Sequence, residues 1–459
     1  MTDKIKITNL NTYEEYKDSD NIWIPNIPKN TKIVKAKNIG DIFTGLTYNP
    51  VNLVDETHKT GILVLRAANI QNGKISYLNN KYINMKIHSK KMVKEGDLLI
   101  CGTNGSRHLV GKSAIISKQE EGMTFGGFMM LLRQNTLEPK YLYYIMNSHF
   151  FKSQIELSAS TSTIYQLTKS NFDNMFFLKI DKKTQKAIAT FLDKKTFLID
   201  SKISILKERK QLILELEKSL INQVVTKGLE SFNLDMNGEK IDFNNEKKLS
   251  KEEFEIYMNK CGYKDSDIEW IGYIPKSWNI TNIKKLFILS RGRVIAKTEL
   301  DKKGLYPVYS SQTKKKGIMG YINTCDYKNQ DLLTWTTDGA NAGKVFKRSG
   351  NFNCTNVCGT LIKKKELNYQ YYSYLLDYLT EFYKRPDING AKIMNNEMAI
   401  IPLLEMNIVI QNKIVSFLDK KISEFQLKVS NIDKEIELLE EYKKTVINDV
   451  VTGKIKVIK

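Results

Sequence analysis

Two glycine-containing loops carry residue types that could hold a phosphate group. Residues 105–113, GSRHLVGKS, resemble the loop that binds nucleotide phosphates through backbone N–H groups and a lysine. That motif needs four residues between its glycines, whereas this loop has five. Residues 338–344, DGANAGK, depart from the motif further. The sequence therefore predicts no nucleotide site in either loop.

One closely spaced cysteine pair could contribute to a metal site. Cys354 and Cys358 form a CxxxC pattern, but a zinc site needs four ligands, and all four histidines lie far upstream in the sequence. We therefore predict no metal site. The five cysteines are an odd number and are widely spread, which favours a reducing compartment over a disulfide framework.

Residues typical of DNA-modifying catalysis do not form a convincing pattern. Amino-methyltransferases carry an Asn/Asp-Pro-Pro-aromatic motif, and the nearest approach to it is Asn49-Pro50-Val51. Acidic residues near lysines, such as Asp387 and Lys392, are common in a chain that is 27% charged, so they do not indicate a nuclease. We predict a chain without a catalytic site; an enzyme with an unrecognised active site is the open alternative.

The positive charge of the chain is concentrated in two segments. The formal net charge is +20, and nearly all of the excess lies in residues 24–183 and 271–410. Two separate basic segments predict two nucleic-acid-binding modules, because lysine and arginine supply affinity for phosphates. A generic lysine-rich surface and an anionic membrane are the alternatives. No stretch approaches the roughly 18 apolar residues of a membrane span, and no secretory signal is evident, so we expect a cytoplasmic protein.

An internal repeat must position these modules. Residues 185–229 align without a gap to residues 411–455, with FLDKK near both starts and VVT near both ends. Neither copy contains proline or an internal glycine before its end, which predicts two long helices. About 40 helical residues would span roughly 60 Å, so the helices could serve as a ruler between the modules.

Both helices carry an apolar column at heptad spacing, typical of a coiled coil. We predict antiparallel pairing about a pseudo-twofold axis, the alternative being that each helix is buried in its own domain. In the first helix Phe191, Leu198, Ile205 and Leu212 form a second apolar row, which predicts a face for another partner. The predicted packing residues are Leu192, Ile199, Leu206, Ile213 and Leu220 in the first helix, and Leu418, Phe425, Ile432, Leu439 and Val446 in the second.

Several motifs resemble those of type I restriction-modification specificity subunits, usually called HsdS. YKDSDIEWIGYIPKSW (residues 263–278) resembles the start of a target recognition domain in that family, and FLDKK with VVTKG resembles its helical spacers. KEGDLLICGTNGS and DLLTWTTDGANAGKVF resemble landmarks of the two recognition domains. NIWIPNIPKN departs from the expected WIGxIP pattern, and residues 232–260 resemble an insertion.

The resemblance, with the pattern of short apolar runs, implies an α+β fold in five segments. These are a first target recognition domain (residues 1–183), a helical spacer (184–228), a linker or insertion (229–270), a second target recognition domain (271–410) and a second helical spacer (411–459).

The resemblance also implies a complex on double-stranded DNA. The chain would read a bipartite, asymmetric target and bind two adenine-N6 methyltransferase subunits, with two motor-nuclease (restriction) subunits as an optional addition. S-adenosylmethionine, ATP and Mg²⁺ would be held by those partners, and no cofactor by this chain. A free-standing DNA-binding protein and a specificity chain of a related type IIB or phage-defence system are the alternatives.

Polar residues in the recognition-domain loops are the predicted DNA contacts. Arginine can read guanine, asparagine and glutamine can read adenine, and lysine more often meets phosphate. The candidates are Asn104, Ser106, Arg107 and Lys112 in the first domain, and Ser311, Gln312, Thr337, Asp338, Asn341 and Lys344 in the second.

Overall fold

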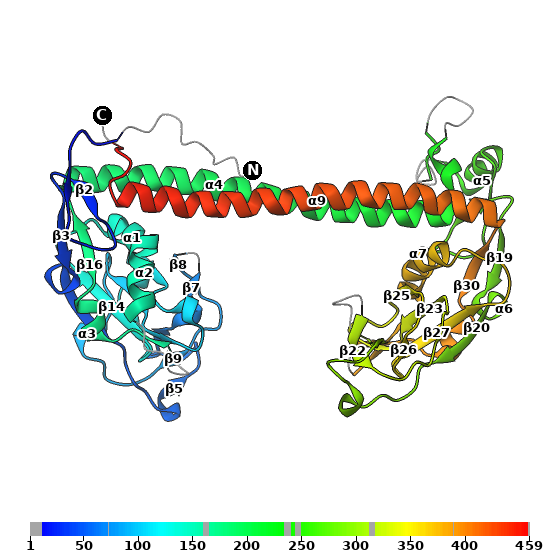
Figure 1. The fold of residues 1–459 in the computed structure, drawn as a ribbon, viewed down its shortest axis with the longest axis horizontal. Helices are drawn as coiled ribbons and strands as arrows, with labels where there is room; N and C mark the ends of the chain where they lie inside the picture. The colour runs from blue at the N-terminus through cyan, green and yellow to red at the C-terminus, as the bar shows by residue number, and fades with distance from the viewer. Residues whose placement is uncertain are drawn as a thin grey trace. The chain divides into compact units, whose positions relative to one another are not determined.

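The computed structural model describes residues 12–71, 73–158, 165–233, 240–243, 249–311, 317–388 and 390–457. The chain divides into two compact units: Met1–Lys207 with Ile432–Lys459, and Glu208–Asn431. Two long helices, α4 (Lys182–Lys227) and α9 (Ile408–Val451), each contribute residues to both units. The mixed content of helices and strands confirms the α+β class (Figure 1).

A four-stranded antiparallel sheet forms the centre of the first unit, in the order β12-β10-β14-β4. Interior strand β10 is buried on both faces, which explains its uninterrupted apolar sequence LLIC. Leu98 and Ile100 join one apolar core, and Leu99 and Cys101 join another on the opposite face. The strands of this sheet are β4 (Gly40–Thr44), β10 (Leu98–Cys101), β12 (Ser113–Ile115) and β14 (Met129–Gln134).

Shorter strands and three helices surround this sheet. The small sheet β13-β6-β9-β5 packs on one face, and its β6 and β13 run parallel. The remaining elements are β1 (Tyr16–Asp18), β2 (Asn26–Pro28), β3 (Lys32–Lys35), β5 (Leu53–Val54), β6 (Ile62–Leu65), β7 (Ile70–Gln71), β8 (Lys74–Ile75), β9 (Tyr82–Ile83), β11 (Thr103–Asn104), β13 (Thr124–Phe125), β15 (Tyr165–Gln166), β16 (Phe176–Lys179), α1 (Pro139–Asn147), α2 (His149–Ser158) and α3 (Lys169–Asp173).

The second unit contains a sheet of the same design, in the order β25-β23-β27-β20. A neighbouring three-stranded sheet again includes one parallel pair, β21 with β26. The elements are α5 (Lys251–Lys260), β17 (Tyr263–Asp265), β18 (Tyr273–Pro275), β19 (Asn279–Asn282), α6 (Ile283–Leu286), β20 (Phe287–Arg291), β21 (Tyr306–Tyr309), β22 (Ile318–Ile322), β23 (Leu332–Thr336), β24 (Asp338–Gly339), β25 (Val345–Arg348), β26 (Asn353–Cys354), β27 (Cys358–Lys363), α7 (Tyr369–Leu379), β28 (Arg385–Asp387), β29 (Gly390–Lys392), α8 (Asn395–Ala399) and β30 (Pro402–Glu405).

The FLDKK motif attaches each sheet domain to a long helix. In the first unit α1 lies between α4 and the sheet (Figure 1), and the Tyr144 hydroxyl donates to Asp193 of FLDKK at 2.7 Å. In the second unit α7 lies between α9 and the sheet, and the Tyr374 hydroxyl donates to Asp419 of FLDKK at 2.7 Å. The recurrence of FLDKK therefore has a structural cause, a repeated tyrosine–aspartate anchor.

A second repeated anchor lies at the start of each long helix. The side-chain amide oxygen of Gln185 accepts from the backbone N–H of Glu138 at 2.7 Å, directly before α1. The side-chain amide oxygen of Gln411 accepts from the backbone N–H of Asn368 at 2.8 Å, directly before α7. Both glutamines are almost fully buried, so these hydrogen bonds are shielded from water and help to fix each domain on its helix.

The two long helices contact each other within each unit. In the first unit Lys202 pairs with Glu435 at 2.7 Å, and the Lys195 ammonium lies 5.7 Å from the ring centre of Tyr442. In the second unit Leu418 of α9 belongs to the same apolar core as Val224 of α4. All ten predicted packing residues are buried or half-buried. In the second apolar row of α4, Leu198, Ile205 and Leu212 are exposed, whereas Phe191 is half-buried against the apolar core of the first unit.

The segment predicted to be a linker or insertion contains folded structure. Helix α5 begins with a capping box, in which the Ser250 N–H donates to Glu253 at 2.8 Å and the Glu253 N–H donates to the Ser250 hydroxyl at 3.3 Å. Phe254 and Met258 of α5 pack with Ile241 and Tyr263 in a small core.

Within the part of the chain that the structure describes, no helix has the length and apolarity needed to cross a membrane.

Candidate nucleic-acid interface

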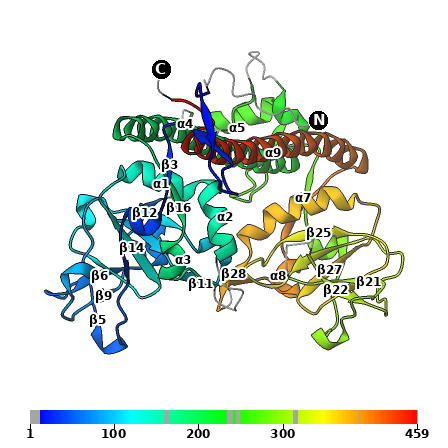
Figure 2. The same ribbon diagram turned by 60° about the vertical axis from the view of Figure 1, so that its left-hand side comes forward.

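The first group of predicted contacts lies on a loop that follows β10. Strand β11 pairs with β15 at Asn104 and Tyr165, and Figure 2 shows β11 at the end of the first unit remote from α4. Two backbone hydrogen bonds of 2.8 Å close the base of the loop, from the Cys101 N–H to the Lys112 carbonyl and from the Gly111 N–H to the Cys101 carbonyl. The two ends of the loop are therefore held together, and its polar residues lie between them.

Asn104, Ser106 and Arg107 come together on this loop. The Asn104 side-chain oxygen accepts from the Ser106 N–H at 2.9 Å, which fixes the turn. The exposed Arg107 guanidinium donates to the carbonyl of Glu156, at the end of α2, at 2.8 Å. A guanidinium has five N–H donors, so this one bond orients the group and leaves further donors for a DNA base or phosphate. Lys112 is half-buried at the base of the loop.

The second group lies on the corresponding loop after β23. Thr337 is fully buried, and its hydroxyl and N–H donate to the Val357 carbonyl at 3.2 and 3.0 Å. Its side chain is therefore committed to the interior and supports the loop. Asp338 is half-buried in β24, which pairs with β29.

Asn341 connects the two loops of the second unit that carry predicted DNA contacts. Its side-chain N–H donates to the Ser311 carbonyl at 3.3 Å, so Ser311 and Asn341 lie together. Lys344 instead pairs with Asp377 of α7 at 3.1 Å, with both side chains about 40% exposed. Gln312, the remaining candidate, lies outside the described residues.

The two loops are built alike. Thr103-Asn104-Gly105 follows β10, and Thr337-Asp338-Gly339 follows β23. In the first unit the Phe128 carbonyl accepts from the N–H groups of Gly102 and Thr103, at 2.9 and 3.0 Å, just as the Val357 carbonyl accepts from Thr337. The turn that carries Phe128 is not among the predicted contacts, although its Gly126-Gly127-aromatic sequence is an available signal.

The phosphate-loop and metal interpretations have no structural support in the residues concerned. Residues 105–113 form a short 3₁₀ helix, Arg107–Leu109, and then enter strand β12, whereas a phosphate-binding loop opens an α-helix. Burial raises the pKa of the Cys358 thiol to about 11 and raises the pKa of Cys354 further. Among the residues that the structure describes, no group of three or more His, Cys, Asp or Glu side chains is placed to hold a metal ion.

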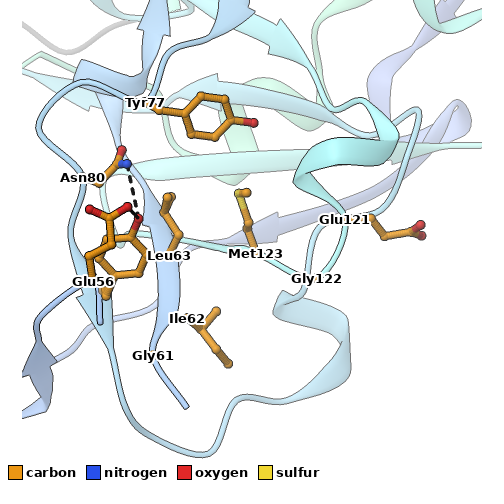
Figure 3. Close-up of a pocket in the computed structure, with 10 residues that line it drawn as sticks. Glu56, Gly61, Ile62, Leu63, Tyr77, Asn80, Glu121, Gly122 and Met123 are labelled. Carbon is orange, nitrogen blue, oxygen red and sulfur yellow. Dashed lines mark hydrogen bonds between the residues drawn. The ribbon is translucent and has the colours of Figure 1, made fainter. Parts of the chain in front are cut away.

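A shallow hollow of about 490 Å³ lies beside β6 and β9 (Figure 3). Both of its lining tyrosines already have partners: the Tyr82 hydroxyl donates to Glu56 at 2.7 Å, and the Tyr77 hydroxyl donates to Glu120 at 2.5 Å. Burial and the Glu120 hydrogen bond raise the pKa of Tyr77 to about 12. Because the lining glutamates are acidic, the hollow is poorly suited to a phosphate.

Sequence comparison matches residues 275–438 to the type I restriction modification DNA specificity domain. The chain is 42% identical over 142 residues to a Mycoplasma pneumoniae protein assigned as the N-terminus of type I specificity subunit S.MpnORF289P, covering 30% of this chain and 74% of that one. It is 35% identical over 138 residues to the specificity subunit of the type I restriction enzyme MpnII of the same organism, covering 30% of this chain but only 41% of that subunit.

Structural comparison covers nearly the whole chain. A chain solved in a study of the complex assembly and conformational transition of the type I restriction-modification system superposes with a TM-score of 0.67, covering 94% of this chain and 99% of that one. The two are 13% identical in sequence, so this similarity describes the fold.

Proposed function

Because this chain belongs to the family of type I restriction-modification specificity subunits, we propose that each of its two sheet domains reads one half of an interrupted DNA target. The observation that carries the proposal is the duplicated loop after β10 and β23. Each loop follows an interior strand of a sheet with the same strand order, and each lies in one of the two basic segments. Two different half-sites follow, because the polar residues of the two loops differ.

We further propose that α4 and α9 pair as an antiparallel coiled coil and set the distance between the half-sites. In the first unit Lys195 meets Tyr442 and Lys202 meets Glu435, so the contacts proceed in opposite directions along the two helices. The repeated glutamine and aspartate anchors support a pseudo-twofold relation between the halves.

The second apolar row of α4 supports a partner surface. Leu198, Ile205 and Leu212 are 55%, 64% and 59% exposed, although burying a leucine or isoleucine contributes about 1.5–3 kcal/mol. We propose that this row contacts an adenine-N6 methyltransferase subunit, of which two would join the complex, with two motor-nuclease subunits as further partners. S-adenosylmethionine, ATP and Mg²⁺ would then bind to those partners, and the chain itself would be non-catalytic.

Reconstitution with the cognate methyltransferase subunit tests this function. We expect the isolated chain to transfer no methyl group, and the complex to methylate adenines in one bipartite sequence, as mapped by sequencing of methylated DNA. A variant with Leu198→Asp, Ile205→Asp and Leu212→Asp should bind DNA but not assemble. Methyl transfer by the isolated chain at a rate comparable to the complex would contradict the proposal.

A further inference from the structure

Phe128 is a large apolar side chain that the first unit holds in water. It is 71% exposed, whereas the next residue, Met129, is 1% exposed. It ends the turn Gly126-Gly127-Phe128 between β13 and β14. Isolated exposed apolar residues are ordinary on protein surfaces, so its position and its backbone contacts decide whether Phe128 has a role.

The backbone of this turn is fixed on several sides. The Leu46 N–H donates to the Phe125 carbonyl at 2.8 Å, the Gly126 N–H to the Leu65 carbonyl at 3.0 Å, and the Met129 N–H to the Gly126 carbonyl at 2.8 Å. A Cβ at Gly127 would lie 3.3 Å from the Leu46 carbonyl oxygen, so the chain passes closely there. Phe128 is therefore presented from a well-supported turn.

The same turn holds the predicted DNA-contact loop. The Phe128 carbonyl accepts both the Gly102 and Thr103 N–H groups, which places Phe128 directly beside the strand that carries Asn104. A cation also lies near the turn, because the Lys91 ammonium donates to the carbonyls of Thr44 and Gly45, at 2.6 and 3.0 Å, next to the Leu46–Gly126 bridge. Phe128 thus lies beside the loop that carries the predicted DNA-contact residues of the first unit.

We propose that Phe128 makes the apolar base contact of the first recognition domain. Phenylalanine contacts the thymine methyl group in the major groove, and it also enters base steps as a wedge; both are apolar contacts to bases. The corresponding turn of the second unit carries exposed Asn356 and half-buried Val357, so this aromatic contact would be confined to one half-site. The inference rests on the proposed function and adds the base-contacting chemistry of its first domain.

The test uses the complete methyltransferase complex and fluorescently labelled target DNA. Phe128→Ala should weaken binding to the target by about 10-fold or more while leaving binding to unrelated DNA within about 2-fold. Phe128→Tyr, which keeps the aromatic face, should stay within about 3-fold of the original affinity. Leu78→Ala is the matched control, because Leu78 is also 71% exposed in the same unit. The unfolding midpoint of Phe128→Ala should be unchanged.

Two modified DNAs identify the kind of contact. If Phe128 meets a thymine methyl group, uracil in the first half-site weakens binding by the original complex but not by Phe128→Ala. If it enters a base step, 2-aminopurine at that step becomes more fluorescent only with the original complex. The inference would be overturned if Phe128→Ala left the affinity for the target unchanged. It would also be overturned if Phe128→Ala impaired assembly with the methyltransferase subunit while DNA binding stayed the same. Failure of the original complex to prefer any sequence would instead refute the proposed function.

Discussion

Two glycines, Gly45 and Gly292, allow backbone segments to pass very close to each other near the predicted DNA-contact loops. Gly45 and Gly292 follow β4 and β20, the equivalent edge strands of the two sheets. A Cβ at Gly45 would lie 1.9 Å from the Gly126 carbonyl oxygen, and one at Gly292 would lie 2.1 Å from the Cys354 carbonyl oxygen. Both contacts are with backbone, which cannot rotate away as a side chain can. Glycine is therefore required at both corners.

Gly45→Ala should lower the free energy of unfolding by about 3 kcal/mol or more, because the backbone must move to admit a methyl group. The matched control is Gly105→Ala, whose Cβ would meet nothing within 4 Å and which should change stability by about 0.5 kcal/mol or less. Urea unfolding of the full chain, followed by circular dichroism, measures both. Equal stability of the two variants would show that this corner relaxes freely.

Under the proposed function, helices α4 and α9 connect recognition to assembly. Each carries an anchor for one sheet domain near its start, with Gln185 and Asp193 on α4 and Gln411 and Asp419 on α9. The buried columns join the apolar cores near their ends, and Leu198, Ile205 and Leu212 of α4 are exposed. The length of the helices can therefore be changed without changing a predicted DNA contact, because no predicted DNA-contact residue lies on either helix.

Inserting one heptad in each helix should move the half-sites apart by about 10 Å, close to three base pairs, because a helix rises about 1.5 Å per residue. The heptad keeps the apolar columns in step, so the half-site sequences should survive and the spacer should lengthen. Methylation mapping of the reconstituted complex gives the spacer directly. Insertion in one helix alone should prevent assembly. If the variant with a heptad inserted in each helix were active and kept the original spacer, the proposal that the helices set the spacer length would be refuted.

At the scale of the whole chain, two units with the same strand order carry different side chains at the same loop. The first unit places Asn104 and Arg107 after β10, whereas the second places Asp338 and Asn341 after β23. Each loop is held by hydrogen bonds within its own unit. Under the proposed function each unit would read its own half-site, and a change in one loop should leave the other half-site unaffected.

Arg107→Ala should cost about 1–3 kcal/mol of target binding and relax the sequence preference at one position of one half-site. The reason is that the guanidinium is exposed and oriented by the Glu156 carbonyl. Methylation mapping should show the other half-site unchanged. Lys118→Ala is the control, since Lys118 is exposed in the same unit but outside the loop. An unaltered preference removes Arg107 from the interface, and changes in both half-sites contradict independent recognition.

The family and the long helices could be predicted from the sequence because their evidence is local. FLDKK, VVT and the heptad columns lie within continuous segments, and α4 and α9 require only helix-forming residues at apolar spacing. The predicted membership of the type I specificity subunits is confirmed by the relatives. The DNA-contact residues remain predictions, since composition can identify a polar loop but not the side chains that meet DNA.

Only the tertiary structure separated residues of similar type. Thr337 and Ser311 are both small hydroxyl residues in predicted loops, yet Thr337 is buried against the Val357 carbonyl and Ser311 is half-buried beside Asn341. Phe128 is one of 19 phenylalanines, and only the pairing of β14 with β10 and β4 places its turn beside the Asn104 loop. Exposure and hydrogen-bond partners depend on strands far apart in the sequence, so local patterns could predict the elements but not which side chains they leave in water.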